Sequence, residues 1–113
     1  MHMEIKDLKE RAREVRRKYA KLEKIRYGHE WSGKDLAIGF VGDVGDLMKL
    51  VMAKEGIRDI EEMDEKFEHE LSDCLWSIMI LADKYGVDLE YSFLRTMDEL
   101  EKRIDSQNKR EKK

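Results

Sequence analysis

Two pairs of acidic residues have the spacing and the surroundings of a metal site. Asp43 and Asp46 are three residues apart, and so are Glu70 and Asp73. In a helix, residues three apart lie on one face, about one turn from each other. Asp43 falls inside an apolar stripe of its segment, and Glu70 flanks another such stripe. Because burying an unpaired carboxylate costs several kcal/mol, acids at these positions need cations, a water-filled cleft, or both.

Three interpretations of these acids are open at this point. In the first, the acids pair with Lys49, Lys66 or arginines on neighbouring helices and are structural. The second is a di-iron site of the ferritin type, which requires Glu-x-x-His on two helices. The chain lacks that motif, since Glu68 stands three residues after Glu65, and His69 stands three after Lys66. The third is a Mg²⁺ site, because Mg²⁺ takes oxygen ligands and keeps water molecules for a phosphate substrate. Two acidic pairs without a glycine-rich phosphate loop favour this third interpretation.

The elements that must position these acids are predicted to be four helices. We expect them over residues 3–26, over 32–54, from a start at 59–64 to 86, and over 88–104. The chain of 113 residues has no proline and seven glycines, and helix-forming residues dominate it, which indicates an all-α protein. Short linkers are typical of antiparallel neighbours, so a four-helix bundle is the predicted fold. Ser32 with Asp35 has the spacing of a capping box, and Gly56 and Asp88 are the expected caps of the second and fourth helices.

Length and composition indicate a single domain over residues 3–105. Met1 and His2 look like an addition from cloning, and residues 106–113 form a polar, charged tail that we expect to be flexible. The single cysteine excludes an internal disulfide and fits a reducing, cytoplasmic location. No apolar run reaches the roughly 20 residues of a membrane span, and no signal-peptide pattern opens the chain. A net charge of −3 gives no general attraction to nucleic acid.

The run from Cys74 to Ala82 is apolar almost all the way around the predicted third helix. A helix of this kind is buried on every side, and one small bundle has too little material to cover it. We therefore expect a homo-oligomer, a dimer or a tetramer, with Trp76 in the subunit interface. His69 points about 100° away from Glu70 on a helix, so we expect a surface or interface histidine at this position rather than a ligand.

The residues around the acids resemble those of a known family. Residues 40–47, Phe-Val-Gly-Asp-Val-Gly-Asp-Leu, and residues 70–73, Glu-Leu-Ser-Asp, are similar to the signature of the MazG-like all-α nucleoside triphosphate pyrophosphohydrolases. That signature is Glu-x-x-Glu on one helix and Glu-x-x-Asp on the next. The resemblance covers about residues 27–98. It is closest to the small dCTP pyrophosphatase branch, in which an aromatic-rich stretch, here residues 27–31, precedes the first acidic helix.

The resemblance implies a four-helix bundle of the all-α NTP pyrophosphatase type. It also implies an enzyme that splits a ribo- or deoxyribonucleoside triphosphate into monophosphate and pyrophosphate and so cleans the nucleotide pool. Mg²⁺, or Mn²⁺ in its place, would serve the hydrolysis. The ligands of the metal, which are also the catalytic residues, would be Asp43, Asp46, Glu70 and Asp73. The residues implied in substrate binding are Tyr27 and Trp31, which would stack on the base, and Lys34, which would contact a phosphate or a loop. The family usually places a phosphate-binding lysine on the last helix at a position where this chain has none, and Lys102, further along, is the candidate to replace it.

The chain departs from the family at the first acidic pair, where two aspartates stand in place of two glutamates. Each aspartate is one methylene shorter, so its oxygens retract by about 1.5 Å, the length of one C–C bond. Mg²⁺ demands near-ideal octahedral geometry. A second interpretation therefore stays open, in which the chain is a catalytically weak or inactive helical oligomer that binds nucleotides or a partner.

Overall fold

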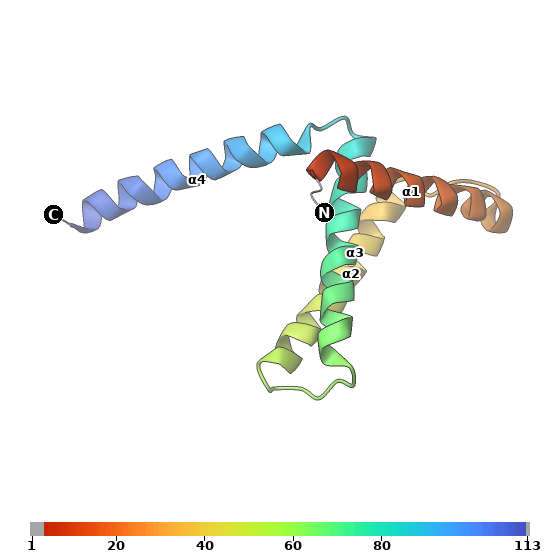
Figure 1. The fold of residues 1–113 in the computed structure, drawn as a ribbon, viewed down its shortest axis with the longest axis horizontal. Coiled ribbons are helices and arrows are strands. Elements are labelled where there is room, and N and C mark those ends of the chain that lie inside the picture. Colours follow the sequence, from red (N-terminus) through yellow and green to blue (C-terminus); the bar gives the residue numbers. More distant parts are fainter. Residues whose placement is uncertain (1–3, 113) are drawn as a thin grey trace.

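Four helices make up the part of the chain that the structure, a computed structural model, describes, which is residues 4–112. They are α1 (Ile5–Tyr27), α2 (Gly33–Lys54), α3 (Met63–Lys84) and α4 (Leu89–Glu111) (Figure 1). These residues contain no strand, so the predicted all-α class is confirmed. α2 and α3 form an antiparallel hairpin, and α1 crosses one end of it (Figure 1). α4 leaves the same end and extends away from the hairpin.

The helix ends carry the caps that the sequence predicts. The Ser32 side chain accepts a hydrogen bond from the Asp35 backbone N–H, and the Asp35 carboxylate accepts one from the Ser32 backbone N–H. Gly56 has a φ of 75°, a left-handed conformation that glycine adopts without steric cost, directly after α2. The Asp88 side chain accepts a hydrogen bond of 3.1 Å from the Tyr91 backbone N–H at the start of α4. These caps delimit the helices that carry the acidic pairs.

The last helix is longer than the sequence analysis predicts. α4 continues to Glu111 rather than ending near residue 104, so residues 106–111 of the expected tail are helical. This stretch contains no glycine or proline, and its lysine, arginine, glutamine and glutamate favour a helix. Met1 to Met3, which include the expected cloning addition, and Lys113 lie outside the described residues.

The core lies where α1 crosses α3. Ala12, Met79 and Ile80 are buried there, and Trp76 packs against them. The Trp76 indole N–H donates a hydrogen bond of 3.1 Å to the Ala12 carbonyl, and the Trp76 ring lies 5.9 Å from the Tyr19 ring. Trp76 therefore joins α3 to α1 within one chain, and it remains partly exposed. Small Ala12 allows this close contact with the indole.

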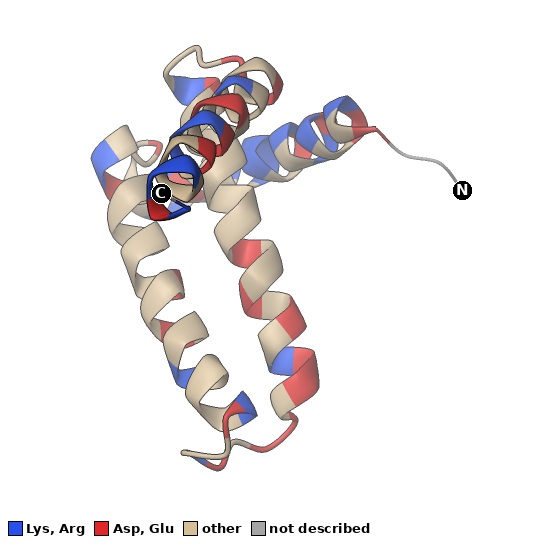
Figure 2. Ribbon diagram, turned by 90° about the vertical axis from the view of Figure 1, so that its left-hand side faces the viewer, with Lys and Arg blue, Asp and Glu red and all other residues tan. Residues whose placement is uncertain are grey.

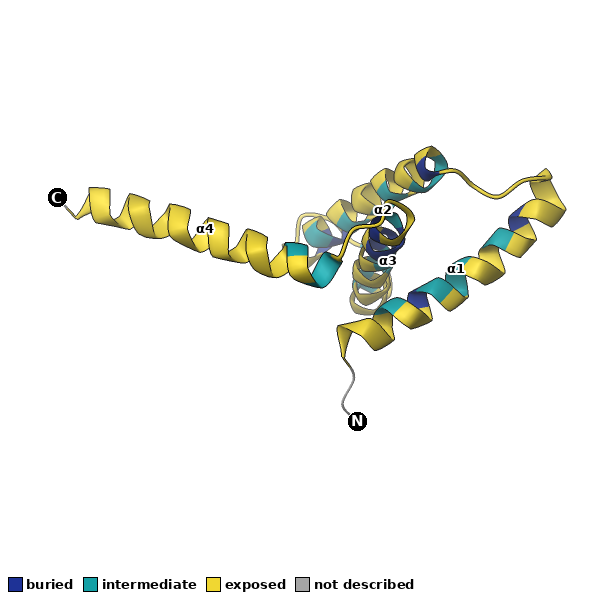
Figure 3. Cartoon of the chain, turned by 90° about the horizontal axis from the view of Figure 1, so that it is seen from above, coloured by how far each residue is buried: buried dark blue, intermediate teal, exposed yellow. Residues whose placement is uncertain are grey.

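Most large apolar side chains stay exposed outside this core (Figure 3). On α3, Leu71, Leu75 and Ile78 are 46%, 46% and 40% exposed, although Cys74 and Met79 beside them are buried. α4 has no buried residue at all. The apolar third helix is thus covered by this chain on one side only. None of the helices within residues 4–112 combines the length and the apolar character needed to cross a membrane.

Candidate metal centre

The two predicted acidic pairs meet between α2 and α3. Asp43 and Asp46 lie on α2, and Glu70 and Asp73 lie on α3. One carboxylate oxygen from each of Asp43, Asp46 and Glu70 lies within 4.8 Å of the other two. Glu70 and Asp73 belong to a second group of the same size, with His69. Acidic segments of both hairpin helices accordingly lie near the middle of the hairpin (Figure 2). The four residues form one acidic cluster, as the spacing predicts.

Burial and mutual repulsion raise the proton affinity of this acidic cluster. Glu70 is half-buried, and its Oε2 is closed to solvent without a hydrogen-bond partner among the described residues. Burial raises the pKa of Glu70, and the charges of Asp73, Asp43 and Asp46 raise it further. Burial likewise raises the pKa of Asp43, and Asp73 and Asp46 add to the increase. His69 opposes this increase for both residues, but burial and the neighbouring carboxylates outweigh it.

Lysine and arginine partners do not account for the acidic cluster. Within residues 4–112, no lysine or arginine nitrogen lies within 4.0 Å of the carboxylates of Asp43, Glu70 or Asp73. Asp46 has Lys49 at 3.9 Å, but both side chains are more than half exposed, and such a pair contributes little to stability. Within the described residues of one chain, Asp46 is thus the member of the acidic cluster that has a lysine or arginine partner.

His69 is exposed, as expected, yet it contacts the acidic cluster. Its Nε2 lies 3.0 Å from Asp73 Oδ2. The two residues are four apart on α3, a spacing that brings side chains together across one helical turn. The expectation that His69 points away from Glu70 and is no candidate ligand is wrong, because a ring nitrogen of His69 lies within 4.8 Å of a carboxylate oxygen of Glu70 and of one of Asp73. The i, i+4 relation to Asp73 was the sequence signal that would have placed His69 here. His69 thus places a nitrogen beside the carboxylate oxygens of the acidic cluster.

An aromatic cavity of about 400 Å³ opens between α1 and the α2–α3 hairpin. Tyr19, Tyr27, Trp31 and Trp76 contribute rings to its lining, and Asp43 of the acidic cluster lies on its wall as well. The cavity therefore connects a set of flat apolar surfaces to one of the carboxylates. Tyr27 and Trp31 are predicted binding residues. Tyr19 and Trp76 were missed, because their places depend on how α1 crosses α3, which the hydrophobic periodicity of either helix does not specify.

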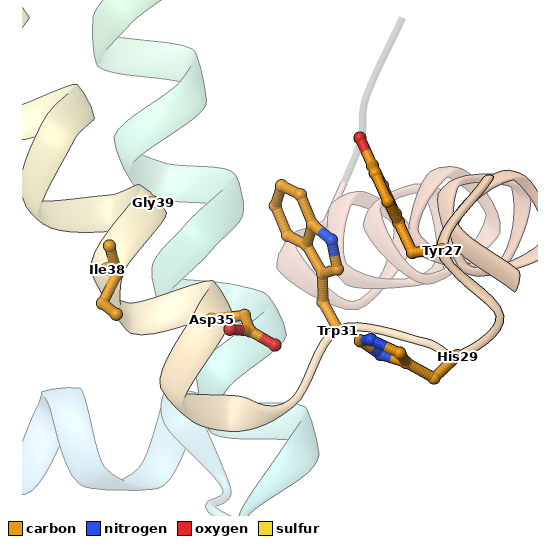
Figure 4. Close-up of a pocket in the computed structure, with 6 residues that line it drawn as sticks. All are labelled: Tyr27, His29, Trp31, Asp35, Ile38 and Gly39. Carbon is orange, nitrogen blue, oxygen red and sulfur yellow. The ribbon is translucent and has the colours of Figure 1, made fainter.

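A second, outer cavity of about 420 Å³ lies beside the first and is open to solvent (Figure 4). The Tyr27 and Trp31 rings stand beside each other at its edge (Figure 4). These two side chains thus border both cavities. The residues that line the outer cavity are Tyr27, His29, Trp31, Asp35, Ile38 and Gly39.

The structure does not bring the two predicted lysines to the cavities. Lys34 is exposed in the first turn of α2 and lines neither cavity. Lys102 is exposed on α4, which extends away from the hairpin (Figure 1). On a helical wheel Lys102 also lies opposite the apolar stripe of α4. Within a single chain, Lys102 is therefore not a neighbour of the acidic cluster.

No family model, no curated protein and no solved structure matches the chain.

The donor atoms of the acidic cluster suit a hard divalent cation. Carboxylate oxygens from two facing helices are the ligand type that such ions take, and an ion there would give Glu70 Oε2 the partner it lacks. A divalent charge would also remove the repulsion that raises the pKa of Glu70 and of Asp43. The residues present therefore fit a metal ion, with an aromatic cavity at its side.

Proposed function

We propose that the protein is a metal-dependent nucleoside triphosphate pyrophosphohydrolase, of the MazG-like kind that its sequence resembles. The observation that carries the proposal is the convergence of Asp43, Asp46, Glu70 and Asp73 beside the aromatic cavity. A triphosphate substrate has a flat base at one end and a chain of anionic oxygens at the other. The cavity and the acidic cluster offer a place for each end.

The side chains of the aromatic cavity would bind the base. Stacking on aromatic rings is available to every nucleobase and contributes about 1–3 kcal/mol per base. A base held among Tyr27, Trp31 and Trp76 has its phosphates directed toward Asp43, since Asp43 lies on the same cavity wall. The contacts favour nucleotides in general, without selecting one base.

The four carboxylates would hold Mg²⁺, or Mn²⁺ in its place. The ion, when bound, supplies positive charge to the phosphates and lowers the pKa of a water molecule. A carboxylate of the acidic cluster accepts a proton from the attacking water, and His69 next to Asp73 can hold that proton or pass it to solvent. The water oxygen forms a bond to the α-phosphorus, the bond from that phosphorus to the α,β-bridging oxygen breaks, and pyrophosphate leaves.

A non-catalytic nucleotide-binding module is the second candidate function. The observation that favours it is the exposure of Asp46, which has Lys49 at 3.9 Å and belongs to the shortened first acidic pair. If Asp46 binds the ion only weakly, the acidic cluster can hold a metal ion without placing it correctly for hydrolysis of the triphosphate. In that case the aromatic cavity still binds a nucleotide, and no product forms.

Product analysis distinguishes the two functions. Ribo- and deoxyribonucleoside triphosphates are incubated one by one with Mg²⁺ or Mn²⁺, and pyrophosphate and orthophosphate are measured separately. We expect pyrophosphate from at least one substrate, no activity with excess EDTA, and no activity in Asp43→Asn. Orthophosphate as the sole primary product, or full activity in EDTA, contradicts the enzyme. Binding of nucleotide without pyrophosphate release supports the second function.

We also propose that the chain associates with copies of itself, as a dimer or a tetramer. The chain exposes 9307 Å², whereas a folded monomer of its mass typically exposes about 6,500 Å². An excess of about 2,800 Å² per chain is enough for a large obligate interface or for two interfaces in a tetramer. On α4, exposed apolar residues recur at spacings of four, three and four, the pattern of a coiled-coil seam: Phe93, Met97, Leu100 and Ile104. A second copy supplies matching apolar stripes. A monomer mass near 13.5 kDa by light scattering at micromolar concentration contradicts self-association.

A further inference from the structure

An ion pair between half-buried Arg16 and buried Glu23 holds the linker between α1 and α2. Arg16 donates two hydrogen bonds to Glu23, from Nη1 to Oε2 at 2.8 Å and from Nη2 to Oε1 at 2.7 Å. Glu23 Oε1 also accepts a hydrogen bond of 2.8 Å from the backbone N–H of Trp31. Glu23 is only 4% exposed, which makes it the most buried charged residue of residues 4–112.

This burial stands out in a chain that leaves most of its large apolar side chains exposed. Taking both charges out of water is costly, and the hydrogen bonds of the pair offset that cost only because they are complete. Arg16 and Glu23 both lie on α1, so the pair does not join α1 to another helix. What it does join is α1 and Trp31, through the backbone N–H. The Glu23 carboxylate, which is buried and fully hydrogen-bonded, thus holds the backbone of one tryptophan, Trp31.

The same residues line the aromatic cavity. Arg16, Glu23 and Trp31 are all part of its wall, together with Trp76 and Asp43. The linker between Tyr27 and the first turn of α2 has one further contact with α1, the ion pair of Glu30 with Lys24 at 3.2 Å, but both of those side chains are more than half exposed. The hydrogen bond that the Trp31 N–H donates to Glu23 is therefore the buried contact that holds Trp31, which is 40% exposed. A loose tryptophan would lose conformational freedom on binding a ligand, and that loss would weaken the affinity.

We propose that Arg16 and Glu23 are positioning residues, which fix Trp31 in the cavity wall before a nucleotide base arrives. The proposal rests on the proposed function for the identity of the ligand. Neither residue needs to touch the base. Glu23 acts through the Trp31 backbone, and Arg16 acts through Glu23, by keeping the carboxylate charged, in place and compatible with burial.

Two variants separate positioning from folding. Glu23→Ala removes the acceptor of the Trp31 N–H but leaves Arg16 buried without its partner. The double variant Arg16→Met with Glu23→Leu also removes the acceptor, while a buried ion pair replaced by apolar residues of similar size usually leaves a protein stable. Glu14→Gln is the matched control, because it breaks an exposed ion pair of α1 with Arg11 at a distance of 3.0 Å.

The first readout does not involve a ligand. In a Trp76→Phe background, Trp31 is the only tryptophan left, and its fluorescence quenching by acrylamide reports its accessibility. We expect quenching to increase in Glu23→Ala and in the double variant, and to stay at the parent value in Glu14→Gln. Unchanged quenching in the folded double variant overturns the proposal.

The second readout is the binding of nucleoside monophosphates, with CMP, UMP, GMP and AMP as probes, by titration calorimetry in EDTA. If freed Trp31 occupies its place a tenth of the time, affinity falls about tenfold. We expect that loss of affinity in Glu23→Ala and in the double variant, and none in Glu14→Gln. The increase in melting temperature that Mn²⁺ gives should be the same in all of these proteins. Equal affinity of parent and double variant overturns the proposal. Failure of the parent to bind any of the probes, with quenching as expected, contradicts the proposed function instead.

Discussion

Among the described residues, Glu70 is the member of the acidic cluster that has a buried carboxylate oxygen without a hydrogen-bond partner and is repelled by all three other carboxylates. Its Oε2 has no hydrogen-bond partner within the described residues, and three neighbouring carboxylates raise its pKa on top of burial. A carboxyl group whose pKa is higher in the folded state than in the unfolded state destabilises the fold at neutral pH. The proposed metal would reverse this effect, and both consequences can be measured on one variant.

Replacement of Glu70 by Gln is therefore expected to raise the melting temperature of the metal-free protein, or to leave it unchanged. Metal at a hundred times its dissociation constant stabilises the parent by about 2.7 kcal/mol, and Glu70→Gln should lose this gain. Melting curves with EDTA and with millimolar Mg²⁺ or Mn²⁺ measure both effects. Glu68→Gln on the same helix is the control, since Glu68 is exposed and outside the acidic cluster. If Glu70→Gln melts at a lower temperature than the parent, and metal does not change the melting temperature of the parent, the acids have a structural role.

The aromatic rings make a second prediction at the same scale. Tyr27→Ala and Trp31→Ala should each weaken nucleotide binding by about 1–3 kcal/mol, because each removes a stacking surface. Metal-induced stabilisation should not change, as neither residue belongs to the acidic cluster. Titration calorimetry measures the first quantity and thermal unfolding the second. Tyr91→Ala, on exposed α4, is the control. Parent-like affinity in both variants would place the base elsewhere.

Glu23 predicts an acid dependence of stability. The hydrogen bonds from Arg16, followed by that from the Trp31 N–H, lower the pKa of Glu23 although burial opposes them. A lowered pKa means that the stabilisation is complete above the ordinary value of 4.5 and is lost as the pH falls through the folded-state value. Glu23→Gln should cost about 3–5 kcal/mol at pH 7, since it strands the Arg16 charge. Urea unfolding of both proteins should show this difference shrinking below pH 4.5.

At the scale of the elements, the sequence predicted what local chemistry controls. Ser32, Gly56 and Asp88 cap their helices as expected, because a cap depends on residues within one turn. The meeting of the two acidic pairs was also predictable, since a short linker makes α2 and α3 antiparallel neighbours. The crossing of α1 over α3 was not predictable. For that reason the sequence analysis also missed the cavity positions of Tyr19 and Trp76 and the pair of Arg16 with Glu23. These contacts join residues far apart in the sequence, and hydrophobic periodicity specifies a face without specifying its partner.

The α1–α3 crossing can be tested at Ala12, which is buried beneath Trp76. Ala12→Leu inserts a larger side chain where Trp76 of α3 packs against α1, and overpacking of this kind typically costs about 1–3 kcal/mol. The free energy of unfolding in urea should fall by that amount. The aromatic cavity should change as well, so nucleotide binding should weaken. Ala37→Leu, on an exposed position of α2, should alter neither quantity. Full stability of Ala12→Leu would contradict the observed crossing.

For the whole molecule, the exposed stripe of α4 predicts how the assembly comes apart. Met97→Glu with Leu100→Glu places two charges in the apolar stripe, which burial in an interface would not tolerate. Light scattering should show the parent as an oligomer and the double variant at a lower mass, with a limit of 13.5 kDa. Ser106→Glu is the control, because residue 106 lies on the opposite side of α4. An oligomer that survives the double variant must use another surface.

Because α4 has few contacts within its own chain, we expect its helicity to depend on protein concentration. A helix without a packed face gains little from tertiary structure, and isolated helices in water are marginal. Within one chain, Leu89 and Glu90 in the first turn of α4 contact the core and Lys9, and α4 has no buried residue. Under the proposed self-association, the rest of α4 draws its stability from neighbouring copies. Dilution should then unwind α4 while α2 and α3 stay folded, so the helical signal per residue in far-UV circular dichroism should weaken as the protein concentration is lowered. Under the proposed self-association, the helicity of α4 therefore measures the fraction of chains that are associated.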